Sequence, residues 1–228
     1  MTKRDKSLDG DPEAYRTQRE WFSATVPKAV PFKKDIKRSI ELYGDGIGRV
    51  DLIDHMGNDL TIVNSVRGQH HRHRTWSYNE ISRRYTDVNI QFYEPEQFRT
   101  QHESNRQASN MHDLVDPEVG YYDMASNTLF KTTASKALKT HHKDCLVLYN
   151  KLMEAGVCRE QARGVLPQNM YAEYYGTCNL NNLLKFIDLR THEGAQWEIQ
   201  KVAEACLEIA EGLWPVAVGA YRRAKDEK

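Results

Sequence analysis

Apolar residues in the second half of the chain recur at the spacing of amphipathic helices. Over Ala134–Glu154 they return every three or four positions, and Gly156 follows as a residue suited to a left-handed helix end. The same spacing predicts a helix over residues 180–189 and a long one over about 195–222. Residues 159–165 have the pattern of a short helix. The second half is therefore expected to be mainly helical.

Short runs of alternating apolar and polar residues in the first half are typical of strands. Residues 50–53 and 60–63 are two such runs, and the glycine, asparagine and aspartate at 57–59 predict the turn of a hairpin. Residues 88–93 and the tyrosine-rich stretch 169–178 are further strand signals. Strands followed by helices indicate an α+β fold, with an antiparallel sheet packed against helices and a helical C-terminal half.

Residues 1–46 differ in character from the rest of the chain. Charges of both signs are mixed in the first twenty residues, and prolines recur in this stretch. Such a composition predicts a mobile N-terminal arm with one short helix near residues 35–42. Three glycines between positions 44 and 48 mark its end. We therefore expect an arm over 1–46 and a single domain over 47–228.

Charge and hydropathy then exclude several classes of partner. The 228 residues hold 32 Lys+Arg and 32 Asp+Glu, so the formal net charge is +0. No general positive field attracts nucleic acid or an anionic membrane, and a bound anion must be held locally. No apolar run approaches the roughly 18 residues of a membrane span, and residues 1–10 lack the core of a signal peptide. We expect a cytoplasmic protein with no membrane or nucleic-acid partner.

The segment 72–85, which reads RHRTWSYNEISRRY, holds the strongest chemical signal. It gathers guanidinium groups, hydroxyls, an amide and a carboxylate, and guanidinium groups bind phosphate oxygens in two-pronged fashion. Ser77 and Glu80 also match a helix capping box, and Glu80 with Arg84 has the spacing of a helical ion pair. A helix N-terminus itself binds phosphate, so both interpretations predict a phosphate or nucleotide site.

Histidines and tyrosines suggest alternatives with weaker support. The histidines within residues 70–73 suggest a metal cluster or an RNA-binding patch, but neighbouring histidines point in different directions and no matching carboxylate or cysteine spacing accompanies them. The four cysteines form no Cys-x-x-Cys pair, so no metal site is predicted. His141 and His142 are expected on exposed helix surface. Tyr171, Tyr174 and Tyr175 are expected to pack in the core rather than to stack on a ligand.

Segment 72–85 resembles the signature of flavin-dependent thymidylate synthases, Arg-His-Arg-x-x-Ser-x-Asn-Glu-x-Ser-x-Arg-Tyr, at every fixed position. Further similarity lies at residues 94–99, 160–167 and 189–199, and the resemblance spans about residues 47–215. It implies a reductive methylation in which dUMP receives a one-carbon unit from methylenetetrahydrofolate to give dTMP. FAD, reduced by NADPH, is the implied hydride carrier. It also implies a homotetramer with active sites shared between subunits.

The resemblance assigns roles to individual residues. Those implied to bind FAD are Arg72, His73, Arg74, Glu80, Asn179, Leu180, Asn181 and Lys185. Those implied to bind dUMP are Gln69, Arg72, Glu80, Ser82, Arg84, Arg163 and Arg190. Arg190 is the implied catalytic residue, because a fixed cation beside the uracil ring polarises the pyrimidine and raises the nucleophilicity of C5.

One departure from the family pattern lies just before the signature. Members carry several dozen residues there, including a helix, a strand and a histidine expected near the flavin. Here residues 61–67 lead through Gly68 directly into the signature, so we expect an internal deletion near residues 67–69. The alternative to an active synthase is therefore a catalytically impaired nucleotide-binding or scaffold relative of that enzyme.

Overall fold

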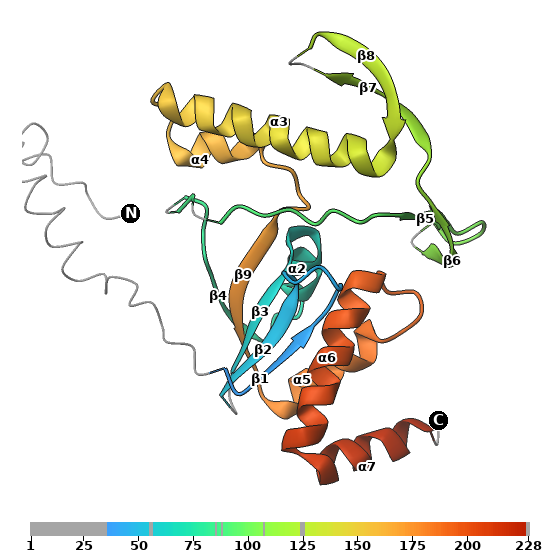
Figure 1. Cartoon of the computed structure of the whole chain (residues 1–228). Helices are drawn as coiled ribbons and strands as arrows, with labels where there is room; N and C mark the ends of the chain where they lie inside the picture. Colours follow the sequence, from blue (N-terminus) through green and yellow to red (C-terminus); the bar gives the residue numbers. More distant parts are fainter. Residues whose placement is uncertain are drawn as a thin grey trace, which may run out of the picture. The chain divides into compact units, whose positions relative to one another are not determined.

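The computed structural model describes residues 36–54, 57–84, 86–87, 89–106, 108–123 and 126–226 (Figure 1). Ile36–Lys228 forms one compact unit. The expected arm up to residue 35 lies outside the described residues, and its last part, residues 36–46, belongs to the compact unit. Among the described helices, none combines the length and apolar character needed to cross a bilayer.

A five-stranded antiparallel sheet forms the centre of this unit, in the order β1-β2-β3-β9-β4. Its strands are β1 (Arg38–Glu41), β2 (Arg49–Asp54), β3 (Gly57–Val63), β9 (Tyr171–Thr177) and β4 (Ser77–Glu80). The predicted hairpin of β2 and β3 is confirmed, although residues 57–59, predicted as its turn, are the first residues of β3. The tyrosine-rich strand is confirmed as β9.

The first strand corrects the helix predicted near residues 35–42. β1 pairs with β2 so that Arg38 lies opposite Leu52 and Ile40 lies opposite Val50. Val50 is fully buried and Leu52 nearly so, with Ile40 packed against the same core. The edge of β2 offers backbone hydrogen bonds to this segment, and the core offers it apolar contacts. Together these outweigh the weak local preference of the segment for a helix.

The signature segment contains a second correction, because β4 is a strand where a capping box predicted the start of a helix. β4 pairs with β9 over its whole length. Glu80 is bound to Arg67 instead of Arg84, and Arg84 pairs with Glu160 at 3.3 Å. The expected phosphate site at a helix N-terminus is therefore wrong.

Close packing holds β4 and the turn before it against β9. A Cβ atom at Gly176 would lie 3.1 Å from ring atoms of Trp76, a tight contact, so glycine allows this ring to approach the strand closely. Trp76 is itself buried, and its ring stacks with Tyr78 at a centroid distance of 6.2 Å. The turn that carries the signature's first residues is thus anchored by aromatic packing.

The helices largely follow the sequence pattern. They are α2 (Asn64–His70), α3 (Ala134–Glu154), α4 (Arg159–Ala162) with the 3-10 turn η2 (Arg163–Val165), α5 (Leu180–Arg190), α6 (Trp197–Leu213) and α7 (Pro215–Asp226). α3 has its predicted bounds, and Gly156 has φ +85°, as its predicted left-handed cap requires. The single helix predicted over 195–222 is instead two helices, because Pro215 lacks the N–H that would continue α6.

The core lies between the sheet and the C-terminal helices. α6 contacts β2 and α2, and α5 packs against α6. The buried face of α6 is formed by Ile199, Val202, Ala203, Cys206, Ile209 and Ala210. Tyr171 and Tyr174 of β9 are buried in the same core, which confirms their predicted packing role, whereas Tyr175 is only half-buried and is not part of this core.

Two hairpins were not predicted from the sequence. β5 (Phe98–Gln101) pairs with β6 (Ser109–Val115), and β7 (Glu118–Asp123) pairs with β8 (Thr128–Thr133). The second hairpin contacts α3, as Figure 1 shows. The strand predicted over 88–93 is wrong in its described part, where only an isolated bridge pairs Phe92 with Met170.

The expectation that both His141 and His142 are exposed is wrong for His142, which is 2% exposed. Its Nδ1 lies 2.8 Å from Glu94 Oε1, its Nε2 lies 2.7 Å from Asn169 Nδ2, and its ring stacks on Phe92. The imidazole therefore donates to the carboxylate and accepts from the amide. His142 therefore connects α3 to Glu94, which lies between β4 and β5, and to Asn169, which lies just before β9.

Candidate functional site

Helix α2 is the element around which the predicted site residues are arranged. It follows β3 without a connecting residue and leads into the turn that begins the signature. Arg67 and Gln69 are two positions apart, which separates their side chains by about 200° around a helix. α2 therefore presents Arg67 to one side and Gln69 to another.

His70, at the end of α2, anchors the helix. Its side chain is completely buried, and its Nδ1 lies 2.6 Å from the Tyr174 hydroxyl. The rings of Trp76 and Phe186 lie 4.4 and 4.5 Å from the imidazole. Burial is the main cause that lowers the pKa of His70 well below its ordinary value, with smaller contributions from neighbouring cationic groups. His70 is therefore a neutral core residue, a role that the sequence pattern did not reveal.

A cavity of about 590 Å³ lies on the Arg67 side of α2. This volume is in the range of sites for small molecules and cofactors, roughly 300–1,000 Å³. The polar residues that define the cavity include Arg67, Glu80, Ser82, Arg83, Glu160 and Arg163. Three predicted substrate-binding residues, Glu80, Ser82 and Arg163, thus meet in one cavity.

The charged groups of the cavity differ in how they are engaged. Arg67 binds both carboxylate oxygens of Glu80 through one terminal nitrogen. Within the described part of the chain, the Arg163 guanidinium has no hydrogen-bond or ion-pair partner. Ser82 Oγ accepts from the backbone N–H of Arg84 at 3.3 Å, which leaves the hydroxyl proton able to donate. The cavity therefore holds a half-buried cation and a hydroxyl donor for an anion.

Arg83 and Arg67 also contribute guanidinium groups that the sequence analysis did not assign. Arg83 donates to the carbonyl oxygen of Asn89 at 3.2 Å, and burial lowers the pKa of its guanidinium despite nearby acidic groups. Because Arg83 lies inside the signature, the sequence could have identified it as a site residue. Arg67 lies before the signature, and only the tertiary structure shows that α2 turns it into the cavity.

Gln69, His73 and Arg190 form a second group on the other side of α2, which we call the arginine corner. Arg190 Nε donates to His73 Nε2 at 3.1 Å, and a terminal nitrogen donates to the backbone carbonyl oxygen of Gln69 at 3.3 Å. To accept this bond, His73 Nε2 must be unprotonated. Burial, and then Arg190, lower the pKa of His73, in agreement with a neutral imidazole.

Arg190 is a cation without a carboxylate partner among the described residues. Burial, followed by repulsion from Arg72, lowers the pKa of its guanidinium below the ordinary value. A guanidinium nevertheless stays protonated at physiological pH. The arginine corner therefore holds an uncompensated positive charge.

The predicted cofactor residues gather beside the signature turn. Asn179 caps α5, because its Oδ1 accepts from the backbone N–H of Asn182 at 2.9 Å. Asn182 Nδ2 also donates to the carbonyl oxygen of Thr75 at 3.3 Å, which joins the start of α5 to the signature turn. Leu180 is half-buried. Other predicted cofactor residues near the start of α5 and in the signature turn have exposed side chains, namely Arg72, Arg74, Asn181 and Lys185.

The predicted residues thus fall into separate groups within one chain. Gln69, Arg72 and Arg190 do not line the cavity that contains Glu80, Ser82 and Arg163. Arg84 is exposed and points to Glu160 at the cavity wall. Searching the described residues finds no group of three or more His, Cys, Asp or Glu arranged to hold a metal ion.

Comparisons with known proteins agree with the sequence signature. Residues 51–216 match the family model described as thymidylate synthase complementing protein. Over 156 residues the chain is 40% identical to a flavin-dependent thymidylate synthase of Thermus thermophilus, covering 68% of this chain and 52% of the relative. Over 192 residues it is 37% identical to one of Aquifex aeolicus, covering 79% and 56%. The chain spans about half the length of these relatives.

A solved structure shares the fold. The chain is similar to a UMP/dUMP methylase, PolB, from Streptomyces cacaoi, whose crystal structure contains 5-Br UMP. The TM-score is 0.56 at 25% sequence identity, over 77% of this chain and 74% of the methylase. Because the family model covers most of the chain and these relatives are 37–40% identical to it, the chain belongs to the thymidylate synthase complementing protein family, that of the flavin-dependent thymidylate synthases.

Proposed function

We propose that this chain binds dUMP and takes part in its reductive methylation to dTMP, with methylenetetrahydrofolate as one-carbon donor and FAD reduced by NADPH as hydride carrier. The observation that carries the proposal is the cavity of about 590 Å³. Glu80 and Ser82 meet Arg163 there although they are far apart from it in the sequence, and the family resemblance assigns all three to dUMP.

Arg163 and Ser82 supply the groups that a nucleotide phosphate needs. The half-buried Arg163 guanidinium has no partner elsewhere in the described structure, and a guanidinium binds phosphate oxygens through two parallel hydrogen bonds. The Ser82 hydroxyl donates a further hydrogen bond. Glu80, fixed by Arg67, provides acceptors for the hydroxyl of the sugar. These groups support the proposal that the phosphate and the sugar bind in the cavity.

Arg190 acts on the pyrimidine ring in this proposal. Its bonds to Gln69 and His73 are to neutral acceptors, so its charge is not cancelled by the protein. A fixed, partly desolvated cation beside a uracil oxygen stabilises negative charge that develops on the ring and favours attack by C5.

Assembly into a homotetramer would bring the two separate groups of predicted substrate residues together. The cavity and the arginine corner lie on different sides of α2, so we propose that the cavity of one subunit is completed by the corner of another. The structural relative bound to 5-Br UMP supports a pyrimidine nucleotide as the ligand of such a site.

The signature turn and the start of α5 fit an FAD site. Arg72, Arg74 and Lys185 are exposed cations that have no partner among the described residues, a donor set suited to the diphosphate of a dinucleotide. Asn179 and Asn181 add amides beside them. FAD bound there would supply the hydride.

The direct connection of β3 to α2 favours a second candidate function. The segment that the family resemblance leads us to expect near residues 67–69 has no counterpart between β3 and the signature, where only α2 lies, and this segment includes a histidine expected near the flavin. A nucleotide-binding relative without synthase activity would retain the cavity and lack turnover. Flavin absorbance of the purified protein, together with dUMP-dependent oxidation of NADPH, selects the synthase, whereas dUMP binding without either selects the second candidate.

Substitution of Arg163 tests the cavity itself. We expect Arg163→Ala to weaken dUMP binding by about tenfold to a hundredfold, because a charge-assisted hydrogen bond contributes about 1.5–3 kcal/mol. Isothermal titration calorimetry measures this. Arg159→Ala is the matched control, since Arg159 is an exposed arginine of the neighbouring turn that pairs with Asp87. Equal affinity for dUMP in both variants would show that the phosphate does not bind in this cavity.

A further inference from the structure

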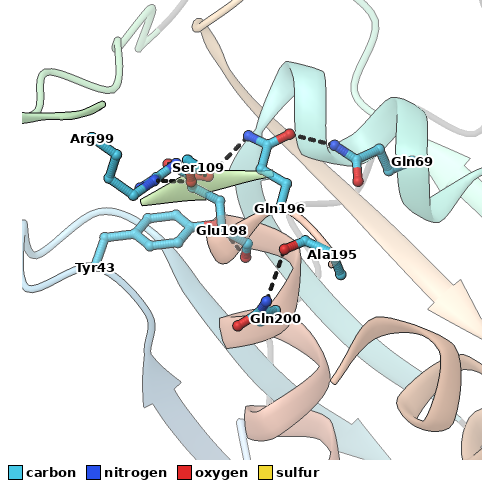
Figure 2. Close-up of polar contacts among 8 residues, drawn as sticks. All are labelled: Tyr43, Gln69, Arg99, Ser109, Ala195, Gln196, Glu198 and Gln200. Atoms are coloured by element: carbon cyan, nitrogen blue, oxygen red, sulfur yellow. Dashed lines mark hydrogen bonds and ion pairs between the residues drawn. The ribbon is translucent and has the colours of Figure 1, made fainter. Parts of the chain in front are cut away.

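Gln69 stands at the end of a row of hydrogen bonds that starts at a buried carboxylate (Figure 2). A terminal nitrogen of Arg99 lies 2.9 Å from each carboxylate oxygen of Glu198. Gln196 Nε2 donates to Glu198 Oε2 at 2.9 Å, and Gln69 Nε2 donates to Gln196 Oε1. We call Arg99, Glu198, Gln196 and Gln69 the amide relay.

Glu198 determines the direction of every bond in the amide relay. A carboxylate paired with a guanidinium accepts hydrogen bonds and donates none. Gln196 must therefore turn its NH₂ group to Glu198, which points its carbonyl oxygen at Gln69. Gln69 must in turn present its NH₂ group to that oxygen. The side-chain oxygen of Gln69 is left facing away from Gln196.

The relay is held rigidly at its buried end. Glu198 is 4% exposed, and the Tyr43 hydroxyl donates to the backbone carbonyl oxygen of the same residue at 3.2 Å. Arg99 Nε donates to Ser109 Oγ at 2.9 Å, and its guanidinium lies 5.6 Å from the ring centroid of Trp197. The β1–β2 loop, the β5–β6 hairpin and α6 therefore all fix the charged pair.

The free end of the relay belongs to the arginine corner. The backbone carbonyl oxygen of Gln69 binds Arg190. In the described structure, the side-chain oxygen of Gln69 has no hydrogen-bond partner. The residue whose backbone binds Arg190 thus also carries an oriented side-chain acceptor. Uracil carries a hydrogen on N3 and can donate to such an acceptor, whereas the unprotonated N3 of cytosine accepts only.

We propose that Glu198 and Gln196 are positioning residues that orient the Gln69 amide, so that its oxygen selects a uracil ring over a cytosine ring. This inference rests on the proposed function, because it places a pyrimidine at the arginine corner. Neither positioning residue touches the ligand. Their effect passes through the hydrogen-bond direction of Gln69.

The substitution Glu198→Gln should reverse the relay. Arg99 donates only, so it engages the amide oxygen of the new side chain and leaves the NH₂ group to Gln196. Gln196 then presents its oxygen to that group and its NH₂ to Gln69, and the Gln69 amide flips. Its outward group becomes a donor, which suits N3 of cytosine.

The measurement is the affinity of the full chain for dUMP and for dCMP by isothermal titration calorimetry. We expect the ratio of the two affinities to fall by about tenfold or more in Glu198→Gln, the size expected when one buried hydrogen bond is lost and its partner left unsatisfied. A ratio within about twofold of wild type overturns the inference while dUMP binding itself upholds the proposed function. If the wild type binds neither nucleotide, both are overturned.

Four further variants separate orientation from general damage to the structure. Glu208→Gln is the matched control, because Glu208 is a carboxylate of α6 that pairs with Arg38 outside the relay, and its ratio should stay at the wild-type value. Gln69→Ala should lower the ratio, and Glu198→Gln added to it should cause no further change. If Glu198→Gln fails to fold, the variant Gln196→Met tests the inference instead. This substitution breaks the relay and keeps the ion pair of Arg99 with Glu198. An unchanged ratio in Gln196→Met overturns the inference.

Discussion

The two sides of α2 differ in how their positive charges are engaged. On the cavity side, Arg67 is bound to Glu80 and Arg84 is paired with Glu160, and Arg163 alone of these three arginines has no partner among the described residues. On the side of the arginine corner, Arg190 meets only a backbone carbonyl oxygen and a neutral imidazole. Paired charges hold side chains in place, whereas an uncompensated charge keeps its field for a ligand. In the proposed function, the cavity therefore binds the nucleotide and the corner provides electrostatic catalysis.

Removal of Arg190 is the strongest test of this difference. Arg190→Ala should lower kcat for dUMP-dependent NADPH oxidation by about 10²–10³-fold, the usual loss when one group that stabilises developing charge is removed. Steady-state kinetics measure kcat and KM separately. Arg222→Ala on α7, whose guanidinium pairs with Glu211, is the control and should leave both unchanged. A rise in KM alone would give Arg190 the same binding role as the cavity arginines.

Removal of the buried histidine should disturb both sides of α2 at once. His70→Ala deletes a ring packed among aromatic side chains and leaves the Tyr174 hydroxyl without its partner. We expect the free energy of unfolding to fall by about 3 kcal/mol, as measured by urea denaturation. The exposed His141 is the control, and His141→Ala should change it by less than about 0.5 kcal/mol. A similar small change for both variants would contradict a core role for His70.

A smaller effect is expected from pH. The pKa of His70 is lowered in the folded protein, so the unfolded chain binds more protons once the pH falls below the ordinary histidine pKa of about 6.5. The contribution of His70 to the free energy of unfolding is fully present above that pH. It falls by up to about 1.4 kcal/mol per pH unit as the pH decreases toward the pKa of His70 in the folded protein. Urea denaturation at several pH values measures the slope.

The variant His70→Gln isolates this contribution, because glutamine does not titrate. Its stability should depend less steeply on pH below about 6.5. A residual slope is expected, since burial also lowers the pKa of His71 and of His73. An identical slope in wild type and variant would show that His70 is not the group that couples stability to pH.

Helices with a sustained apolar repeat were predictable in detail, as α3 shows. Its apolar spacing predicted the bounds Ala134–Glu154, and Gly156 at φ +85° ends it as expected. The prediction for β4 failed because Ser77 and Glu80 satisfy a local capping pattern, while β9 offers four residues of antiparallel pairing. Long-range hydrogen bonds and the packing of Trp76 outweighed the local signal.

The sequence alone determined the family, the guanidinium-rich signature and the segments with a long apolar repeat, because these depend on residue identity and local periodicity. Only the tertiary structure decided that Arg163 meets Ser82 in one cavity, that Arg190 lies at a separate corner, and that Glu198 orients Gln69. The physical reason is that such contacts join residues roughly 80 to 130 positions apart, whose approach is set by strand pairing and helix packing rather than by local sequence.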